Sequence, residues 1–396
     1  MDNRWIILAV IFFVRTTMGF QFQSVASVTP FLIEALNIDY TRLGILIGLY
    51  HLPGVVLAFP GGLLGKRFGD KRVVMSALVL MAIGGLIMAL SDSYAFSFTG
   101  RLLGGFGAIL LNVLLTKMIA DWFVGKEIIT AMAILVSSWP FGISLGLISL
   151  GKLATVSSWQ IVMYLTAGAC LIAFALVAVF YRAPPAVNEK RETPSARTKF
   201  SWQELSLVIL AGLIWSLFNV GFIALPSFAP DLLTSIGYTV TGAASMVSMV
   251  TWLSIFSVQF GGYVSEKLAR PNAILVPCFL GIGIGMCLLP FWPHPVALLV
   301  WLGLLFGPPA GIIMALPAEV LHPENRAAGM GLFYSCSYGG MMALTSLAGF
   351  SRDVTQNAAS PILLGGMLVV VAIIILAIFR AFQARIKLMP VELKAQ

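Results

Sequence analysis

Long apolar runs separated by short polar segments are the dominant pattern along the chain. Each run is about 20 residues long, enough for an α-helix to cross the hydrocarbon core of a bilayer. Helices are expected because backbone polar groups in lipid must pair within their own segment. A β-barrel would instead show alternating segments of about ten residues. The runs predict twelve membrane helices, at residues 5–28, 41–64, 73–90, 95–120, 128–150, 159–181, 205–229, 241–264, 273–291, 296–316, 327–350 and 361–382.

The pattern repeats after two hundred residues, which divides the chain into two related halves. Paired glycines and a charged pair at residues 61–67 recur at residues 261–267, and a Pro-x-Leu segment at residues 30–32 recurs at 230–232. Each half holds an even number of expected spans, so both copies enter the membrane in the same direction, and a binding site is expected between them. We therefore predict an all-α membrane protein of two pseudo-symmetric six-helix bundles.

The predicted domains follow from this repeat and from one polar stretch between the halves. The first bundle covers residues 1–181 and the second covers residues 205–382, with a tail at 383–396. Residues 182–204 contain three prolines and mixed charge but little apolar content, so we expect a flexible cytoplasmic linker.

Composition and charge support a membrane protein with cytoplasmic termini. The chain is 59% hydrophobic and 10% charged, against roughly 25% charged in a soluble domain. The net charge of +8 does not indicate a nucleic-acid partner, because most of the 24 Lys and Arg lie in short loops on the side of both termini. The first run lacks a cleavable signal pattern and is expected to be retained. All four cysteines lie in apolar runs without metal or redox spacing, so no cofactor is expected.

Three segments resemble motifs of the major facilitator superfamily. These are the loop at residues 61–72, its weaker copy at 261–270, and Arg101 followed by glycines at 104, 105 and 107. The resemblance implies a monomeric secondary transporter of a bacterial inner membrane, working by alternating access. It also assigns gating or motif roles to Gly62, Lys66, Arg67, Gly69, Asp70, Arg101, Glu266 and Lys267.

Two departures from the family pattern bear on mechanism. Lys66 stands where the family usually has an aspartate, so Asp70 or Glu266 would have to supply the acid of the cytoplasmic charge network. The fifth expected helix, with Ser138 to Gly142, lacks the glycine-proline signature of proton-driven drug antiporters. It is more similar to bacterial members that carry small anions such as cyanate or nitrate.

Arg15 is the strongest candidate for binding a solute. It lies about ten residues into the first helix, hence about 15 Å deep. Ionisable residues at that depth are costly and usually face a cavity or a partner. None of the 16 acidic residues falls in the middle of a span. We expect Arg15 to hold an anionic group of the substrate through parallel hydrogen bonds. The alternative is a structural arginine bonded to carbonyls of a neighbouring helix.

Other polar and aromatic residues within spans are weaker candidates, because packing and interhelical hydrogen bonding also account for them. Trp215 occupies the position of Arg15 in the second half. The predicted substrate-binding set beside Arg15 is Gln21, Gln23, Trp139, Trp215, Asn219, Tyr334 and Tyr338, with Tyr50, Asn112, Ser138, Trp252 and Ser335 as further candidates.

His51 is the one histidine within an expected span, and its reference pKa near 6.5 makes it a candidate for coupling transport to protons. The alternative is a neutral histidine that shares a hydrogen bond.

The sequence thus favours a secondary transporter of a small anion, with a proton-coupled exporter of drugs or metabolites as the alternative. An enzyme is not expected, because no span holds a catalytic carboxylate pair or a serine-histidine-acid set. A transport-like sensor remains a third class.

Overall fold

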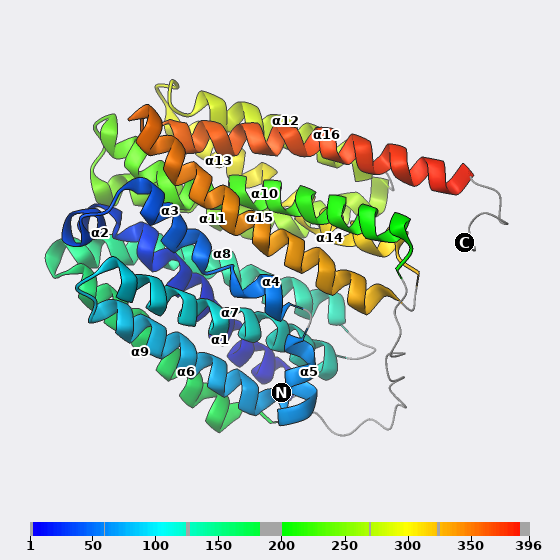
Figure 1. Ribbon diagram of the computed structural model, residues 1–396, viewed down its shortest axis with the longest axis horizontal. Helices are drawn as coiled ribbons and strands as arrows, with labels where there is room; N and C mark the ends of the chain where they lie inside the picture. Colours follow the sequence, from blue (N-terminus) through cyan, green and yellow to red (C-terminus); the bar gives the residue numbers. More distant parts are fainter. Residues whose placement is uncertain are drawn as a thin grey trace.

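The computed structural model describes residues 3–58, 60–123, 127–182, 200–268, 271–322 and 325–388, and these contain helices and no strand. Figure 1 shows the long helices of both halves running side by side. The helices are α1 (Asn3–Ser27), α2 (Thr29–Leu36), α3 (Tyr40–Leu49), α4 (Pro53–Leu57), α5 (Gly61–Phe68), α6 (Asp70–Ala89), α7 (Tyr94–Trp122), α8 (Ile128–Val156), α9 (Trp159–Phe180), α10 (Trp202–Ser235), α11 (Val240–Leu268), α12 (Pro271–Leu288), α13 (Pro295–Leu305), α14 (Pro308–Val320), α15 (Arg326–Thr355) and α16 (Ser360–Leu388).

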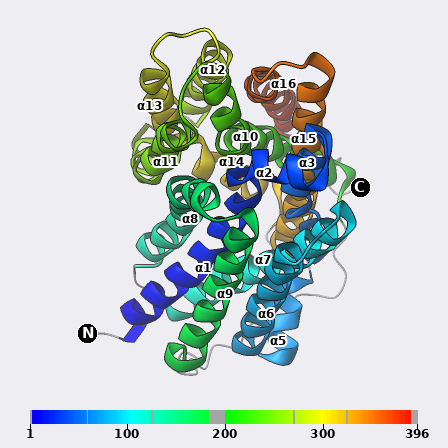
Figure 2. The ribbon, with the colours of Figure 1, turned by 90° about the vertical axis from the view of Figure 1, so that its left-hand side faces the viewer.

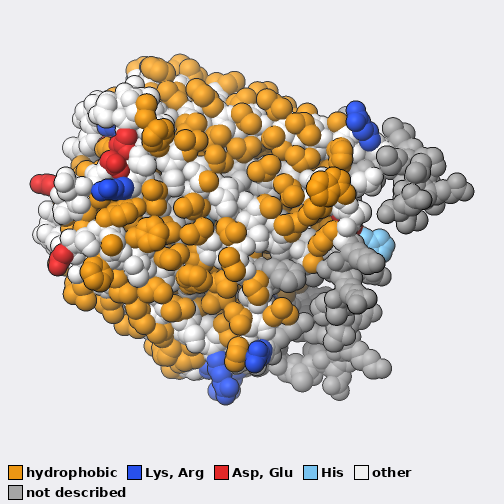
Figure 3. Space-filling model, viewed as in Figure 1, with side chains coloured by type: hydrophobic (Ala, Val, Ile, Leu, Met, Phe, Trp, Pro, Cys, Tyr) orange, Lys and Arg blue, Asp and Glu red, His pale blue; other side chains and the backbone are white. Residues whose placement is uncertain are grey.

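Eleven helical stretches among the described residues are long and apolar enough to cross a membrane. The remaining expected span, residues 327–350, lies within α15, a helix of 30 residues that is more polar than the other long helices. α15 packs along α3 and α10 inside the bundle, so it needs fewer lipid-facing apolar residues. Figure 3 shows hydrophobic side chains over most of the viewed face and charged ones at its margins, the pattern of a surface solvated by lipid.

The two halves form separate groups of helices that meet along two seams. Figure 2 shows α6, α7 and α9 on one side of the molecule and α12, α13 and α16 on the other. α8 packs against α11 at one seam, and α3 and α4 pack against α15 at the other. A Cβ atom added to Gly349 of α15 would lie 2.1 Å from the carbonyl oxygen of Tyr40, so glycine is needed for this close approach.

Two expected helices are broken where the sequence pattern predicted continuous spans. The helix expected at 41–64 is divided into α3, α4 and α5, with Pro53 opening α4 and Pro60 preceding α5. The helix expected at 296–316 is divided at Phe306, and Pro308 opens α14. Proline has no N–H to donate and its ring obstructs the preceding turn, which explains both interruptions.

The ends of the expected linker also differ from the prediction. α10 begins at Trp202, before residue 205, because Ser201 and Glu204 form a capping box. The Ser201 hydroxyl accepts from the Glu204 N–H at 3.1 Å, and the Glu204 carboxylate accepts from the Ser201 N–H at 3.1 Å. α16 continues to Leu388, beyond the helix end expected at residue 382. The rest of the linker, 183–199, and the tail end, 389–396, lie outside the described residues.

Candidate functional site

A cavity of about 340 Å³ lies between the two halves, and side chains of both line it. α1, α7, α8 and the break between α3 and α4 supply one wall. α10, α11, α14 and α15 supply the other. The volume is at the lower end of the range for pockets that bind small molecules, about 300–1,000 Å³. The predicted residues that it brings together are Arg15, Tyr50, His51, Asn112, Trp139, Trp215, Asn219, Tyr334 and Tyr338.

Arg15 reaches the cavity from α1 and is only 9% exposed. Its Nη1 donates to the carbonyl of Leu135 at 2.7 Å and to Ser138 Oγ at 3.3 Å, both on α8. Its Nε and Nη2 donate to Asn112 Oδ1 at 3.1 and 2.9 Å. Arg15 therefore makes the carbonyl contacts expected of an arginine with a structural role. It also lines the cavity, as expected of an arginine that binds a solute.

The positive charge of Arg15 is not balanced by an acid. Within the described part of the chain, no carboxylate oxygen lies within 4.0 Å of its guanidinium. One N–H of Nη2 also has no acceptor among these residues. The dipoles of the carbonyls and of the Asn112 amide stabilise the cation. The second N–H of Arg15 Nη2 remains as a donor for a ligand.

Asn112 connects Arg15 to the second half of the chain. Its Nδ2 donates to the Tyr338 hydroxyl at 3.2 Å. The Tyr338 ring stacks on Tyr334, with centroids 6.2 Å apart, and on His51, with centroids 6.0 Å apart. The cation and the aromatic wall are therefore adjacent. A Cβ atom at Gly54 would lie 2.2 Å from this tyrosine ring, so glycine leaves the space that the ring occupies.

His51 lies in the turn between α3 and α4, where the helix break directs it toward the cavity. Its ring also packs against Phe22 at 5.2 Å and Trp139 at 6.4 Å. Its Nδ1 is buried and makes no hydrogen bond within the described residues. Proton coupling by His51 stays a prediction.

The second half contributes Trp215 and Asn219 from α10. Asn219 Nδ2 donates to the Trp215 carbonyl at 2.8 Å, one turn earlier on the same helix. The Trp215 ring lies 5.8 Å from that of Phe218. The wall facing Arg15 is therefore largely aromatic.

Gln21 and Gln23 lie outside the cavity wall. The amide of Gln21 donates to the Met81 carbonyl at 2.8 Å, and its Oε1 accepts from the Tyr50 hydroxyl at 3.2 Å. Gln23 Nε2 donates to the Pro226 carbonyl at 3.0 Å, across the two halves. Six residues at about 100° each place Gln21 about 120° around α1 from Arg15, which accounts for the different surroundings.

Arg101 is a buried brace at the junction of three helices. From α7, its guanidinium donates to the carbonyls of Leu46, Gln21 and Phe22 at 2.9, 3.0 and 2.8 Å. It also lies 4.4 Å from the centre of the Tyr50 ring. This geometry matches bracing of α7 against α1 and α3, and Arg101 does not line the central cavity.

The motif loop between α5 and α6 is only partly described. Asp70 pairs with Lys117 of α7, which also lies 3.4 Å from Asp121. Arg67 lies over the Phe68 ring, and Gly69 has a φ of 87°, which favours glycine. Asp70 therefore pairs with Lys117, a cation of the same half of the chain. The side chains of Lys66, Glu266 and Lys267 and the surroundings of Gly62 lie outside the described residues.

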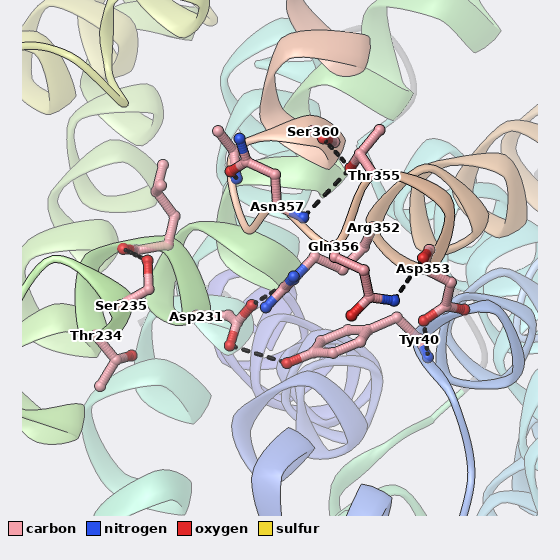
Figure 4. Close-up of polar contacts among 12 residues, drawn as sticks. Tyr40, Asp231, Thr234, Ser235, Arg352, Asp353, Thr355, Gln356, Asn357 and Ser360 are labelled. Carbon is pink, nitrogen blue, oxygen red and sulfur yellow. Dashed lines mark hydrogen bonds and ion pairs between the residues drawn. The ribbon is translucent and has the colours of Figure 1, made fainter.

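A polar cluster at one end of the molecule was not predicted from the sequence. Asp353 of α15 accepts from the N–H groups of Tyr40 and Thr41 at 3.0 and 2.6 Å, which caps α3. The Tyr40 hydroxyl and Arg352 Nε both donate to Asp231 of α10, at 3.0 and 3.3 Å. Figure 4 shows Arg352, Asp231 and Asp353 converging on Tyr40. These contacts join the two halves. The one feature of the sequence that could have indicated this cluster is Arg352, a basic residue in a segment expected on the side opposite the termini, where few Lys and Arg lie.

Replacing Asp353 with asparagine should loosen this end of the molecule. An amide cannot replace the carboxylate at both N–H groups, and each lost bond to a charged group is worth about 1.5–3 kcal/mol. We expect a cysteine introduced at the buried position Ser227, beside a small cavity under this cluster, to react about tenfold faster with a membrane-impermeant maleimide. Asp92→Asn, at an exposed position, is the control. Equal labelling rates in the two variants would show that the cluster does not hold this end closed.

Two bundles of membrane helices around a shared cavity define a transporter of small solutes. A model of the Major Facilitator Superfamily matches residues 11–345, and the chain belongs to this superfamily. The chain is 23% identical over 368 residues to the Hexuronate transporter of Bacillus subtilis, covering 87% of this chain and 86% of that protein. It is 25% identical to the Uncharacterized transporter YycB of the same organism, covering 91% and 89%.

Solved structures with the same fold are transporters as well. The inward open xylose transporter XylE from E. coli superposes with a TM-score of 0.77 at 14% identity, over 94% of this chain and 95% of that one. The nucleoside transporter NupG superposes with a TM-score of 0.73 at 14% identity, over 96% and 99%. The chain is therefore a multi-pass membrane transporter and not an enzyme.

Proposed function

We propose that this transporter moves a small organic anion by alternating access, with Arg15 as the group that selects negative charge. The observation that carries the proposal is the buried guanidinium at the cavity wall, which has no carboxylate within 4.0 Å among the described residues and retains one N–H without an acceptor. An anion bound there offsets the cost of holding a cation in a low-dielectric region.

The relatives and the closed end of the molecule add support. A hexuronate, the solute named for one relative, carries a carboxylate. The charge distribution favours both termini on the cytoplasmic side of a bacterial inner membrane. In that orientation the Tyr40 cluster ties the halves together at the outer face, as expected for one state of an alternating-access cycle.

A proton-coupled exporter of drugs or metabolites is the second candidate, favoured by the aromatic wall opposite Arg15. In that case Arg15 would act only through its bonds to Leu135 and Asn112. His51, whose Nδ1 has no hydrogen bond among the described residues, is the group that proton coupling would use in either case.

Matched ligand pairs separate the two candidates. The thermal stability of the purified full-length chain would be measured with benzoate and benzamide, and with galacturonate and galactose, since a ligand of the folded state stabilises it. We expect at least one anion to raise the melting temperature more than its neutral partner, and Arg15→Gln to remove that difference. Equal effects of charged and neutral partners, or a difference that survives Arg15→Gln, would favour the exporter.

A further inference from the structure

Aromatic rings from both halves dominate the cavity beyond Arg15. The rings include those of Trp139, Trp215, Phe222, Phe306, Tyr334 and Tyr338. Flat apolar faces favour a flat apolar ligand, because a ring gains offset or edge contacts in addition to the area it buries. A body with polar groups all around it would instead have to be desolvated against these walls.

Three polar side chains of the cavity, Asn112, Asn219 and Ser254, already bond to the protein. Asn112 uses Oδ1 for Arg15 and one Nδ2 hydrogen for Tyr338. The Ser254 hydroxyl donates to the Thr251 carbonyl at 2.8 Å, and Asn219 donates to the carbonyl of the preceding turn. Each sugar hydroxyl left without a partner costs about 1–3 kcal/mol. These three side chains therefore offer little to the several hydroxyls of a sugar acid, and the N–H groups of Trp139 and Trp215 and the hydroxyl of Tyr334, which make no hydrogen bond among the described residues, belong to aromatic rings.

The cation and the aromatic wall are close enough to act on one small molecule. Arg15 and Tyr338 share Asn112 as a hydrogen-bond partner, at 2.9 and 3.2 Å, and the Tyr338 ring continues to the ring of His51 at 6.0 Å. An anionic group on the open N–H of Arg15 therefore places the rest of the ligand among rings.

We infer that the cargo is an anion with a flat aromatic body, such as an aromatic carboxylate, and not a polyhydroxylated sugar acid. This inference rests on the proposed function, because it takes Arg15 as the site of the anionic group. It goes beyond that function because it also specifies the chemistry of the rest of the solute, the part that is not the anionic group. Trp139, which faces the cavity beside His51, is the ring whose loss should most reduce the preference for aromatic over saturated anions.

The test is a comparison of dissociation constants for three carboxylates, measured by calorimetry on the full-length protein in detergent. Benzoate should bind about threefold to tenfold more tightly than cyclohexanecarboxylate, as ring contacts of about 0.5–1.5 kcal/mol predict. Galacturonate should bind at least about tenfold more weakly than benzoate, as two or more unpaired hydroxyls predict. Trp139→Leu should bring the affinities for benzoate and cyclohexanecarboxylate closer together. Trp202→Leu, at a position 77% exposed and outside the cavity, should keep the preference.

The outcomes separate this inference from the function on which it rests. Galacturonate binding as tightly as benzoate would overturn the aromatic cargo while leaving an anion transporter in place. So would equal binding of benzoate and cyclohexanecarboxylate by the unmodified protein, whether or not the Trp139 variant folds. If none of the three carboxylates binds, both the inference and the proposed function are wrong.

Discussion

Replacing Arg15 with glutamine should reduce anion uptake by at least about thirtyfold. The substitution removes the charge and the open N–H at the cavity wall, and losing one partner of a buried charged pair costs about 2 kcal/mol or more. Uptake of labelled benzenesulfonate into proteoliposomes is a suitable measurement, because the sulfonate stays ionised at neutral pH and does not cross lipid as a neutral acid.

Two variants serve as controls for this result. Arg15→Lys retains the charge but not the planar fork of donors, so it should recover part of the uptake. Lys152→Met removes a cation at an exposed position on α8 and should leave uptake unchanged. Uptake by Arg15→Gln at the normal rate and affinity, in correctly inserted protein, would show that Arg15 is structural.

Replacing Arg101 with methionine should lower the stability of the fold, whereas replacing Arg15 should lower transport. We expect the Arg101 variant to lose folded protein before it shows any specific loss of transport. Three carbonyls, those of Leu46, Gln21 and Phe22, lose their donor in a fully buried region. At about 1.5–3 kcal/mol for each lost hydrogen bond to a charged donor, the loss is at least about 4 kcal/mol. The melting temperature of the purified protein, followed with Lys152→Met as control, measures this effect. A melting temperature equal to that of the control would mean that Arg101 does not brace α7.

The sequence predicted the architecture well because lipid imposes strict rules on length and apolarity. The repeat at residues 61 and 261 predicted two halves, and the cavity does lie between helices of both. The breaks at Tyr50 and Phe306 were not predicted, since both runs were expected to form continuous helices. Both breaks supply cavity residues, so this error concerned the site and not only the fold.

Partners across helices could not be predicted in the same way. Arg15 was expected at the cavity, but its contacts with Leu135 and Asn112 depend on how α1 packs against α7 and α8. Gln21 was expected in the substrate-binding set, but its direction around α1 turns it to Met81. A difference of about 120° around a helix axis is enough to move a side chain from a cavity into a helix interface.

The cluster around Tyr40 shows a second limit of sequence reasoning. Tyr40 and Asp353 are 313 positions apart, and neither belongs to a recognised motif. Contacts of this kind follow from the docking of the two halves, which local patterns do not specify. Asp70 is similar, because its pairing with Lys117 was not among the contacts expected around Lys66.

The most direct test of anion binding beside Arg15 is a crystal structure of the protein with 4-iodobenzoate, whose iodine is located by its anomalous signal. We expect the iodine among the aromatic rings of the central cavity and the carboxylate within hydrogen-bonding distance of Arg15 Nη2. Iodine bound only outside this cavity, or a carboxylate directed away from Arg15, would contradict the account.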